Sequence, residues 1–154
     1  MISEKDAIII SHLRGNARKK ITKIAEHTDI PVTTIYDKVR LHEKKFFKRH
    51  VTLLDFQRLG LLSHAALAIK VDRERREDLR KFLFAHTNIN TLYRTNTGYD
   101  FLAETVFRNP AELQAFIDDL EANYKTQDIK NFTFIEVLKR EQFLTDPKHR
   151  EVLL

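Results

Sequence analysis

Residues 20–44 have the sequence KITKIAEHTDIPVTTIYDKVRLHEK, in which two helical patterns flank a short break. Apolar side chains recur at helical spacing before the break, and Ile35 and Val39 are four residues apart after it. The break is Asp-Ile-Pro at residues 29–31, and proline suits the first turn of a helix because its missing N–H is not needed there. The stretch therefore predicts two short helices joined by a tight turn, with the apolar side of the second helix facing inward.

The residues on either side continue this pattern. Residues 3–14 predict an earlier helix that ends at Gly15-Asn16, because Gly and Asn accept the left-handed conformation that terminates helices. Residues 46–54 (FFKRHVTLL) are rich in strand-forming and basic side chains, and we interpret them as a two-stranded wing. Three helices followed by a basic hairpin are typical of a winged helix-turn-helix, whose third helix is the recognition helix.

The second half of the chain has a different pattern, in which short alternating segments are separated by amphipathic ones. The order of these segments is βαββαβ, which predicts a ferredoxin-like domain with two helices on one face of a four-stranded antiparallel sheet. The fold class is therefore α+β. We expect strands at residues 63–71, 89–95, 101–107 and 128–138, and helices at residues 74–86 and from Asn109 onward.

The last expected strand carries large apolar residues on both faces. Phe132 and Phe134 alternate with Ile135 and Val137, so only one of the two sets packs on the helices. The other set would be exposed to solvent unless another surface packs on it. A second copy of the domain, sheet against sheet, is the simplest cover and predicts a symmetric dimer.

The net charge of +5 is unevenly distributed along the chain. Residues 1–58 carry 13 Lys and Arg against 7 Asp and Glu, whereas residues 59–154 carry 14 against 15. The first part therefore suits a polyanion and the second does not. We expect a winged helix-turn-helix domain at 1–58, a ferredoxin-like domain at 59–144, and a tail at 145–154 that is either disordered or packed on a partner subunit.

Composition excludes several classes of function. The chain has no cysteine, which removes disulfides, thiolate metal sites and a cysteine nucleophile. Its uninterrupted apolar runs stop at about five residues, Ala65–Ile69, against the roughly twenty that a membrane span needs. The seven histidines are scattered and form no metal motif. We therefore expect no catalytic residues, no metal, no cofactor and no membrane association, and, since no signal peptide is recognisable, a cytoplasmic location.

The candidates for contact with double-stranded DNA lie on and around the recognition helix. Asp37 would repel phosphate unless it pairs with Lys38 or Arg40, or accepts from a cytosine N4 amino group. The alternative is that these polar side chains merely solvate a helix surface. The candidates on the helix are Thr33, Thr34, Tyr36, Lys38 and Arg40, and those for phosphate neutralisation are Lys19, Lys20, Lys44, Lys48 and Arg49.

The order and spacing of particular residues resemble those of a known family. They are Asp6, Arg18, Ile24-Ala25, Leu53-Leu54-Asp55, Leu59-Gly60, Gly98-Tyr99-Asp100, Thr133 and Val137-Leu138. On these residues the chain resembles the Lrp/AsnC (feast/famine) transcriptional regulators over nearly its whole length. Three features depart from the family pattern: Asp29 replaces a frequent Gly, Pro31 replaces a Ser, and no Gly separates the recognition helix from the wing.

The resemblance implies a DNA-binding homodimer or higher homo-oligomer, whose second domain (a RAM-like domain) also binds an amino acid at the interface between dimers. Gly98 and Asp100 match the family's effector loop, so Asp100 would offer a carboxylate to the α-ammonium group. Without a ligand the same residues would make an ordinary hairpin turn. The candidate effector residues are Thr97, Gly98, Tyr99, Asp100 and Thr133.

Two other functions remain open at this point. One is an architectural DNA-binding protein that responds to no effector. The other is an enzyme subunit acting on tetrapyrroles, a role that some proteins of similar two-domain architecture have taken. The basic first domain and the lack of a nucleophile–base arrangement argue against the enzyme.

Overall fold

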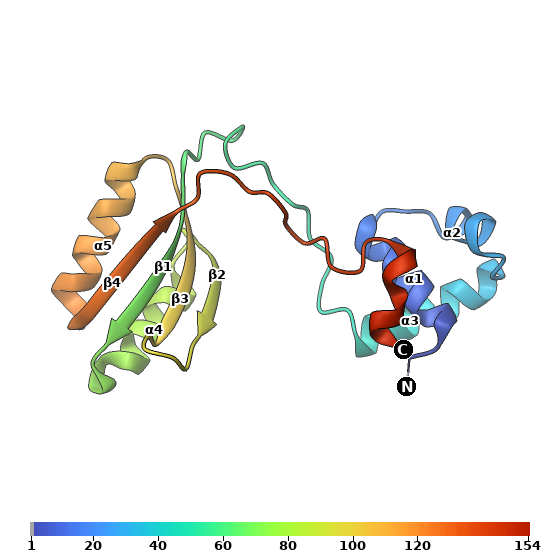
Figure 1. The fold of residues 1–154 in the computed structure, drawn as a ribbon, viewed down its shortest axis with the longest axis horizontal. Coiled ribbons are helices and arrows are strands. Elements are labelled where there is room, and N and C mark those ends of the chain that lie inside the picture. Colours follow the sequence, from blue (N-terminus) through green and yellow to red (C-terminus); the bar gives the residue numbers. More distant parts are fainter. Residues whose placement is uncertain (1) are drawn as a thin grey trace. The chain divides into compact units, whose positions relative to one another are not determined.

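The first part of the chain folds into three helices, drawn in blue and cyan in Figure 1: α1 (Glu4–Gly15), α2 (Ile21–Thr28) and α3 (Val32–Lys45). They are seen in a computed structural model that describes residues 2–154. Ser3 caps α1 in a box with Asp6, in which each side chain binds the other residue's backbone N–H. The expected helix-turn-helix is thus confirmed.

The turn between α2 and α3 forms without glycine. Asp29 ends α2 in the left-handed conformation, with φ of 53°. Aspartate adopts this conformation more readily than most residues, because its short polar side chain can form local hydrogen bonds. Pro31 follows and directly precedes the first residue of α3. The departures from the family pattern at these two positions therefore leave the turn intact.

A small apolar core holds the three helices together. It contains Ile9 and Leu13 from α1, Ile24 from α2, Ile30 from the turn and Ile35 from α3. All four isoleucines are less than 5% exposed. The inward-facing side of α3 follows the pattern that its sequence predicts.

The expected wing is not formed. Between α3 and Ser63 the structure contains no strand, and Val51, Leu53 and Leu54 are each more than half exposed. A hairpin needs a tight turn and a buried face, and the stretch 46–54 contains no Gly, Asn or Asp to make the turn. Its strand-forming residues therefore have no strand partner, and Phe46 and Phe47 instead donate their N–H groups to the His42 carbonyl.

The ferredoxin-like prediction is confirmed. The four strands are antiparallel and lie in the order β2-β3-β1-β4, which interleaves the two βαβ halves, with β1 and β3 in the centre of the sheet (Figure 1). No helix in residues 2–154 is long and apolar enough to cross a membrane. The elements are β1 (Ser63–Val71), a single turn η1 (Arg73–Arg75), α4 (Arg76–Ala85), β2 (Ile89–Arg94), β3 (Phe101–Phe107), α5 (Pro110–Tyr124) and β4 (Thr126–Thr133).

One face of the sheet packs on α4 and α5. Leu67 and Ile69 of β1 and Phe101 of β3 are at most 1% exposed, and they meet Leu83 of α4 and Leu120 of α5 in a single core. Alternate residues of β1 and β3 therefore point toward the helices, as the period of two predicts. This core is the larger of the two in the chain.

The last strand is shorter than expected. β4 ends at Thr133, and Phe134 makes the final hydrogen bond, from its N–H to the His64 carbonyl. Because β1 begins at Ser63, which lies opposite Ile135 in this register, the residues from Glu136 onward have no strand to pair with. Ile135 is 96% exposed and Leu138 is 85% exposed.

The C-terminal residues pack on α1 of the same chain, so the tail is not disordered as one expectation had it, and packing of its apolar end on a partner subunit stays a prediction. The buried Ser11 hydroxyl donates to the Leu144 carbonyl over 2.7 Å, and Arg150 pairs with Glu4 over 3.0 Å. A 3-10 segment, η2 (Pro147–Leu153), then lies beside α1 (Figure 1). The described residues accordingly form two units, one with the chain up to Thr52 together with Leu138–Leu154, the other with Leu53–Val137.

We expect Ser11→Ala to lower the free energy of unfolding of the helical unit by about 1 kcal/mol, because the Leu144 carbonyl loses its hydrogen-bond donor. Urea titration followed by the amide NMR signals of α1 and α3 measures this. Thr22→Ala, which removes an exposed hydroxyl from α2, is the matched control. Equal stability of the two variants would contradict a structural role for the C-terminal segment.

Candidate nucleic-acid interface and effector cleft

The inner side of α3 is fixed by burial. Ile35 and His42 are fully buried, and Val39 is partly buried against the same core. Thr34 is also half-buried. These positions leave one continuous side of the helix facing solvent.

That side carries a row of five exposed residues, which we call the α3 stripe: Thr33, Tyr36, Asp37, Arg40 and Lys44. Their spacing of three or four residues places them on one helix face. The Arg40 guanidinium lies 5.8 Å from the centre of the Tyr36 ring, a cation–π contact on the surface. The structure thus brings four of the expected DNA-contacting residues together, with Asp37 among them.

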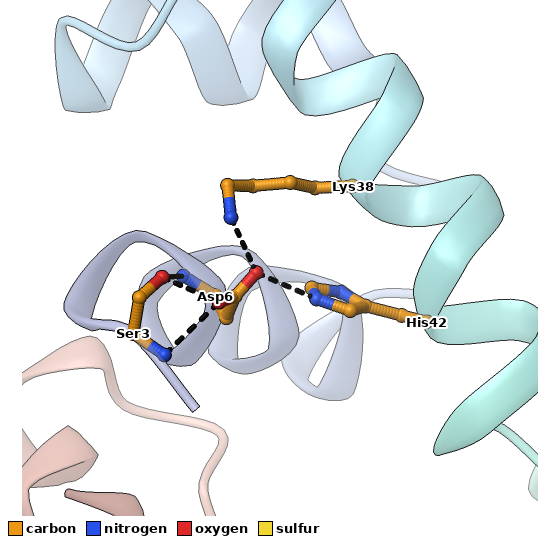
Figure 2. Close-up of polar contacts among 4 residues, drawn as sticks. All are labelled: Ser3, Asp6, Lys38 and His42. Carbon is orange, nitrogen blue, oxygen red and sulfur yellow. Dashed lines mark hydrogen bonds and ion pairs between the residues drawn. The ribbon is translucent and has the colours of Figure 1, made fainter. Parts of the chain in front are cut away.

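Lys38, another DNA candidate, points into the unit. Its Nζ lies 2.7 Å from Asp6 Oδ1, and His42 Nε2 lies 2.9 Å from the same oxygen (Figure 2). Ser3 binds the other oxygen through its backbone N–H and its hydroxyl. Asp6 therefore ties the start of α1 to two residues of α3 that are one turn apart.

The contacts of Asp6 control its ionisation. Burial disfavours the charged form, but the hydrogen bonds from Lys38, Ser3 and His42 outweigh burial and hold the pKa of Asp6 below its ordinary value of 3.8. A carboxylate with a lowered pKa in the folded state stabilises that state above its unfolded pKa. The stabilisation is lost as the pH falls through the folded-state pKa.

We expect Asp6→Asn to destabilise the helical unit by ~2 kcal/mol at pH 7, because Lys38 then loses its charged partner. The difference from the parent should shrink as the pH falls below about 4, because the unfolded chain then gains a proton on Asp6 that the folded state still resists. Urea titrations at pH 7 and pH 3, followed by the amide NMR signals of α1 and α3, test both points. Glu26→Gln, which breaks an exposed ion pair, is the control. A loss that is equal at both pH values would contradict the role of the charge.

A basic cleft lies between the end of α1, the start of α2 and the C-terminal segment. Lys19 Nζ is 3.1 Å from His12 Nδ1, and burial, with the charges of Lys19 and His27, lowers the pKa of His12. Sequence reasoning found Lys19 and Lys20 here but missed the others, because the C-terminal wall is distant in the chain. The lining residues are His12, Gly15, Asn16, Lys19, Lys20, Lys23, His27, Thr145 and Pro147.

The remaining phosphate candidates, Lys48 and Arg49, are exposed in the extended stretch after α3. Among the described residues, neither makes a side-chain hydrogen bond or an ion pair. The helical unit thus presents cations at three places, namely the α3 stripe, the basic cleft and this stretch. In residues 2–154 no group of His, Asp and Glu side chains is arranged to hold a metal ion.

The loop between β2 and β3 holds the expected effector residues. Gly98 adopts φ of 77°, a conformation that favours glycine. Asp100 is well anchored, because its Oδ2 accepts from the Val71 N–H over 3.0 Å and its Oδ1 pairs with Arg76 over 2.7 Å. The Tyr99 hydroxyl donates to Asp128 over 2.6 Å, which fixes the ring against β4.

This loop borders an open cleft of about 1240 Å³ at one end of the sheet. Gly98, Tyr99 and Asp100 line it, whereas Thr97 does not and instead donates to the Asn96 side chain. Thr133 lies far from it, because it pairs with Ala65, six residues along β1 from Val71, roughly 20 Å away. Four cations that the sequence analysis did not identify also line the cleft, namely Lys70, Arg73, Arg76 and Arg94. The lining residues are Lys70, Val71, Arg73, Arg76, Tyr93, Arg94, Thr95, Asn96, Gly98, Tyr99, Asp100, Leu102 and Gln127.

The sheet face opposite α4 and α5 is not covered by those helices. Tyr93 is 57% exposed and Phe132 is 53% exposed on this face. The Phe134 ring packs edge-on against His64, whose Nε2 lies 2.6 Å from Glu104 Oε1. The uncovered sheet face therefore has an aromatic surface around the partly buried pair of His64 and Glu104.

We expect Asp100→Ala to lower the free energy of unfolding of the sheet unit by ~2 kcal/mol, because Val71 N–H and Arg76 both lose their acceptor. Asp100→Asn should lose less, since an amide oxygen still accepts from Val71. Urea unfolding followed by tyrosine fluorescence reports mainly on this unit, which holds three of the four tyrosines, Tyr93, Tyr99 and Tyr124. Full stability of the alanine variant would show that Asp100 is free for a ligand.

Comparison with known proteins agrees with this architecture. A helix-turn-helix unit joined to a ferredoxin-like unit is typical of a two-domain DNA-binding regulator. A family model described as "Lrp/AsnC ligand binding domain" matches residues 64–143, so the chain belongs to the Lrp/AsnC family of transcriptional regulators. Family members are regulators and not enzymes, which answers the tetrapyrrole alternative.

Individual relatives are distant but similar over most of their length. The HTH-type transcriptional regulator FL11 of Pyrococcus horikoshii is 25% identical over 76% of this chain and 78% of its own. Zrp of Zymomonas mobilis, another HTH-type regulator, is 23% identical over 90% of this chain and 94% of its own. Among solved structures, AsnC of E. coli has a TM-score of 0.80 at 17% identity, covering 91% of this chain and 96% of its own. The L-Met complex of regulator NMB0573 from Neisseria meningitidis has a TM-score of 0.83 at 15% identity, covering 91% of this chain and 94% of its own.

Proposed function

We propose that this protein binds duplex DNA through the α3 stripe and that a small molecule bound by the sheet unit modulates this binding. The observation that carries the proposal is the division of α3 into two sides. Lys38 and His42 anchor the helix to Asp6, while Thr33, Tyr36 and Arg40 face solvent together. A helix held in this way can enter a major groove without rearranging its own unit.

The phosphate contacts come from the cations around α3. Lys20, Lys48 and Arg49 are exposed, and Lys44 extends the α3 stripe at its C-terminal end. Such contacts position the protein on the duplex but carry no sequence information. The basic cleft adds Lys23 and His27 to this set.

Asp37 supports base recognition by the α3 stripe. Of its two conceivable partners, Lys38 is bound to Asp6 and Arg40 lies over Tyr36. Asp37 is exposed and, within residues 2–154, has no ion-pair partner. We propose that it accepts a hydrogen bond from a cytosine N4 amino group, the base-edge donor that suits a carboxylate.

The proposed assembly is a dimer, which the uncovered sheet face supports. Tyr93 and Phe132 are large, exposed and apolar there, and such a surface is typical of an interface between subunits. A two-fold dimer would present its α3 helices to half-sites about one helical turn apart, roughly 34 Å. We propose that the first domain binds DNA and that the second binds the effector, as the sequence leads us to expect.

The proposed effector site is the open cleft beside Gly98–Asp100. The family model is named for ligand binding, and one structural relative was solved with L-Met. In this chain Gly98 and Tyr99 would present backbone to the ligand, and Asp100 would hold the loop in place. Thr97 and Thr133 lie outside the cleft of a single chain and would contribute only through a neighbouring subunit.

We expect Arg40→Ala to weaken specific DNA binding about tenfold or more, because a base-edge or phosphate contact is lost from the centre of the α3 stripe. Fluorescence anisotropy with the duplex upstream of the protein's own gene, against a shuffled duplex and at several salt concentrations, measures this. Lys81→Gln on α4 removes one charge outside the helical unit and is the control. Equal affinities of Arg40→Ala and the parent for the specific duplex would contradict the proposed interface.

A further inference from the structure

The basic cleft of the helical unit gathers ionisable side chains of a single charge sign. It has a volume of about 640 Å³ and lies where the end of α1, the start of α2 and the C-terminal segment meet. None of the described residues that line it is acidic. A concave surface with one sign of charge concentrates ions of the opposite sign. The ionisable residues that line the cleft are His12, Lys19, Lys20, Lys23 and His27.

The carboxylates closest to these residues in sequence are bound elsewhere. Glu26 pairs with Lys23 over 2.7 Å, and Asp146 accepts from the Lys148 N–H over 2.9 Å. Lys20, by contrast, is exposed and makes no side-chain hydrogen bond or ion pair within residues 2–154. The cleft therefore has a positive charge that the protein itself does not neutralise.

The C-terminal segment forms one wall of the cleft, through Thr145 and Pro147. It comes close to α1 at Gly15, where a Cβ atom would lie 3.1 Å from the Thr145 carbonyl oxygen. The hydrogen bond from Ser11 to the Leu144 carbonyl holds the adjoining residue. The wall is thus packed on α1, which distinguishes the cleft from a group of lysines on an open surface.

His12 accepts a hydrogen bond inside the cleft. Lys19 Nζ lies 3.1 Å from its Nδ1, and because an ammonium group only donates, this ring nitrogen carries no proton. The His27 ring lies 6.4 Å from the His12 ring and donates from its own Nδ1 to the Lys23 carbonyl. Burial and the charges of Lys19 and His27 lower the pKa of His12, which keeps this ring neutral at pH 7.

An anion in the cleft reverses this balance. It stabilises the imidazolium form of His12, and a proton on Nδ1 breaks the hydrogen bond from Lys19. Lys19 is then released to bind the same anion, so one proton creates two new donors. Because the bound state holds the extra proton, affinity for the anion rises as the pH falls through the pKa of His12 in the complex.

We propose that the basic cleft binds a phosphate group and that His12 takes up a proton when it does so. Phosphate oxygens are the acceptors that lysine ammonium and imidazolium groups bind most strongly. The phosphate belongs either to the DNA backbone or to a free phosphate compound. Where DNA supplies it, the inference rests on the proposed DNA binding and adds to it a pH-dependent contact outside the α3 stripe.

The first test is fluorescence anisotropy of the full-length protein with the duplex upstream of its own gene, at pH 8, 7 and 6 and constant ionic strength. We expect the affinity of the parent to rise about fivefold from pH 8 to pH 6. His12→Gln can still accept from Lys19 but cannot take up a proton, so it should lose most of this rise. His149→Gln, on the C-terminal segment but outside the cleft, is the matched control and should keep it.

The second test identifies the source of the phosphate. The amide NMR signals of Gly15, Asn16 and Lys19 are followed at pH 6 during titration with the duplex and, separately, with inorganic phosphate. Shifts that saturate below about 1 mM inorganic phosphate assign the cleft to a free phosphate compound. Shifts that occur only with the duplex assign it to the DNA backbone.

The contrary outcomes separate this inference from the proposed function. Cleft signals that change with neither probe would overturn the phosphate site. A pH dependence of duplex affinity that survives in His12→Gln would overturn the proton uptake. In both cases, binding of the duplex through the α3 stripe would still stand. If the duplex does not bind at all, the proposed function fails, and the titration with inorganic phosphate still decides whether the cleft is a phosphate site.

Discussion

The ion pair between Asp6 and Lys38 is the constraint on which the DNA-binding half depends. A helix of 14 residues with two buried side chains could rotate about its axis, since its apolar side is narrow. Asp6 prevents this by holding Lys38 and His42 at once, so that the opposite side of α3 must face solvent. The same carboxylate completes the cap of α1, which couples the start of one helix to the orientation of another. Recognition of a groove requires this kind of fixed presentation, because base-edge hydrogen bonds tolerate little displacement.

In the sheet unit, the corresponding role belongs to Asp100. It lies after a loop that reverses the chain at Gly98, and it binds the end of β1 and the first residue of α4. The family resemblance marks this residue as a ligand contact, whereas its geometry in this chain makes it a brace that positions the cleft. The cations that surround it are distributed over β1, η1, α4 and β2, and no local sequence pattern unites them. In both units, therefore, one well-anchored carboxylate holds the local structure in place, and basic side chains nearby remain exposed to solvent.

Much of the architecture follows from local signals. The alternation at residues 63–71 predicts β1 to the residue, and the Asn-Pro pair predicts the start of α5, because burial on one face and capping are local properties. The wing was predicted wrongly from residues 46–54, since strand propensity acts only where a partner strand exists. The length of β4 was predicted wrongly for the same reason, because β1 begins at Ser63 and offers no partner to the residues after Ile135. Thr97 and Thr133 were grouped with Gly98 by resemblance, although the sheet register keeps Thr133 at the other end of β1.

The sequence by itself determined the order of elements, the family, the excess of positive charge in the first third and the outward position of Thr33, Tyr36 and Arg40. These depend on spacing along the chain, which periodicity reveals directly. Only the tertiary structure decided that Lys38 serves the fold and that the C-terminal segment rests on α1. It alone also decided that four cations meet in one cleft around an occupied Asp100. Each of these joins residues distant in sequence, and the pairing of distant side chains is fixed by packing and register, which a single sequence does not encode locally.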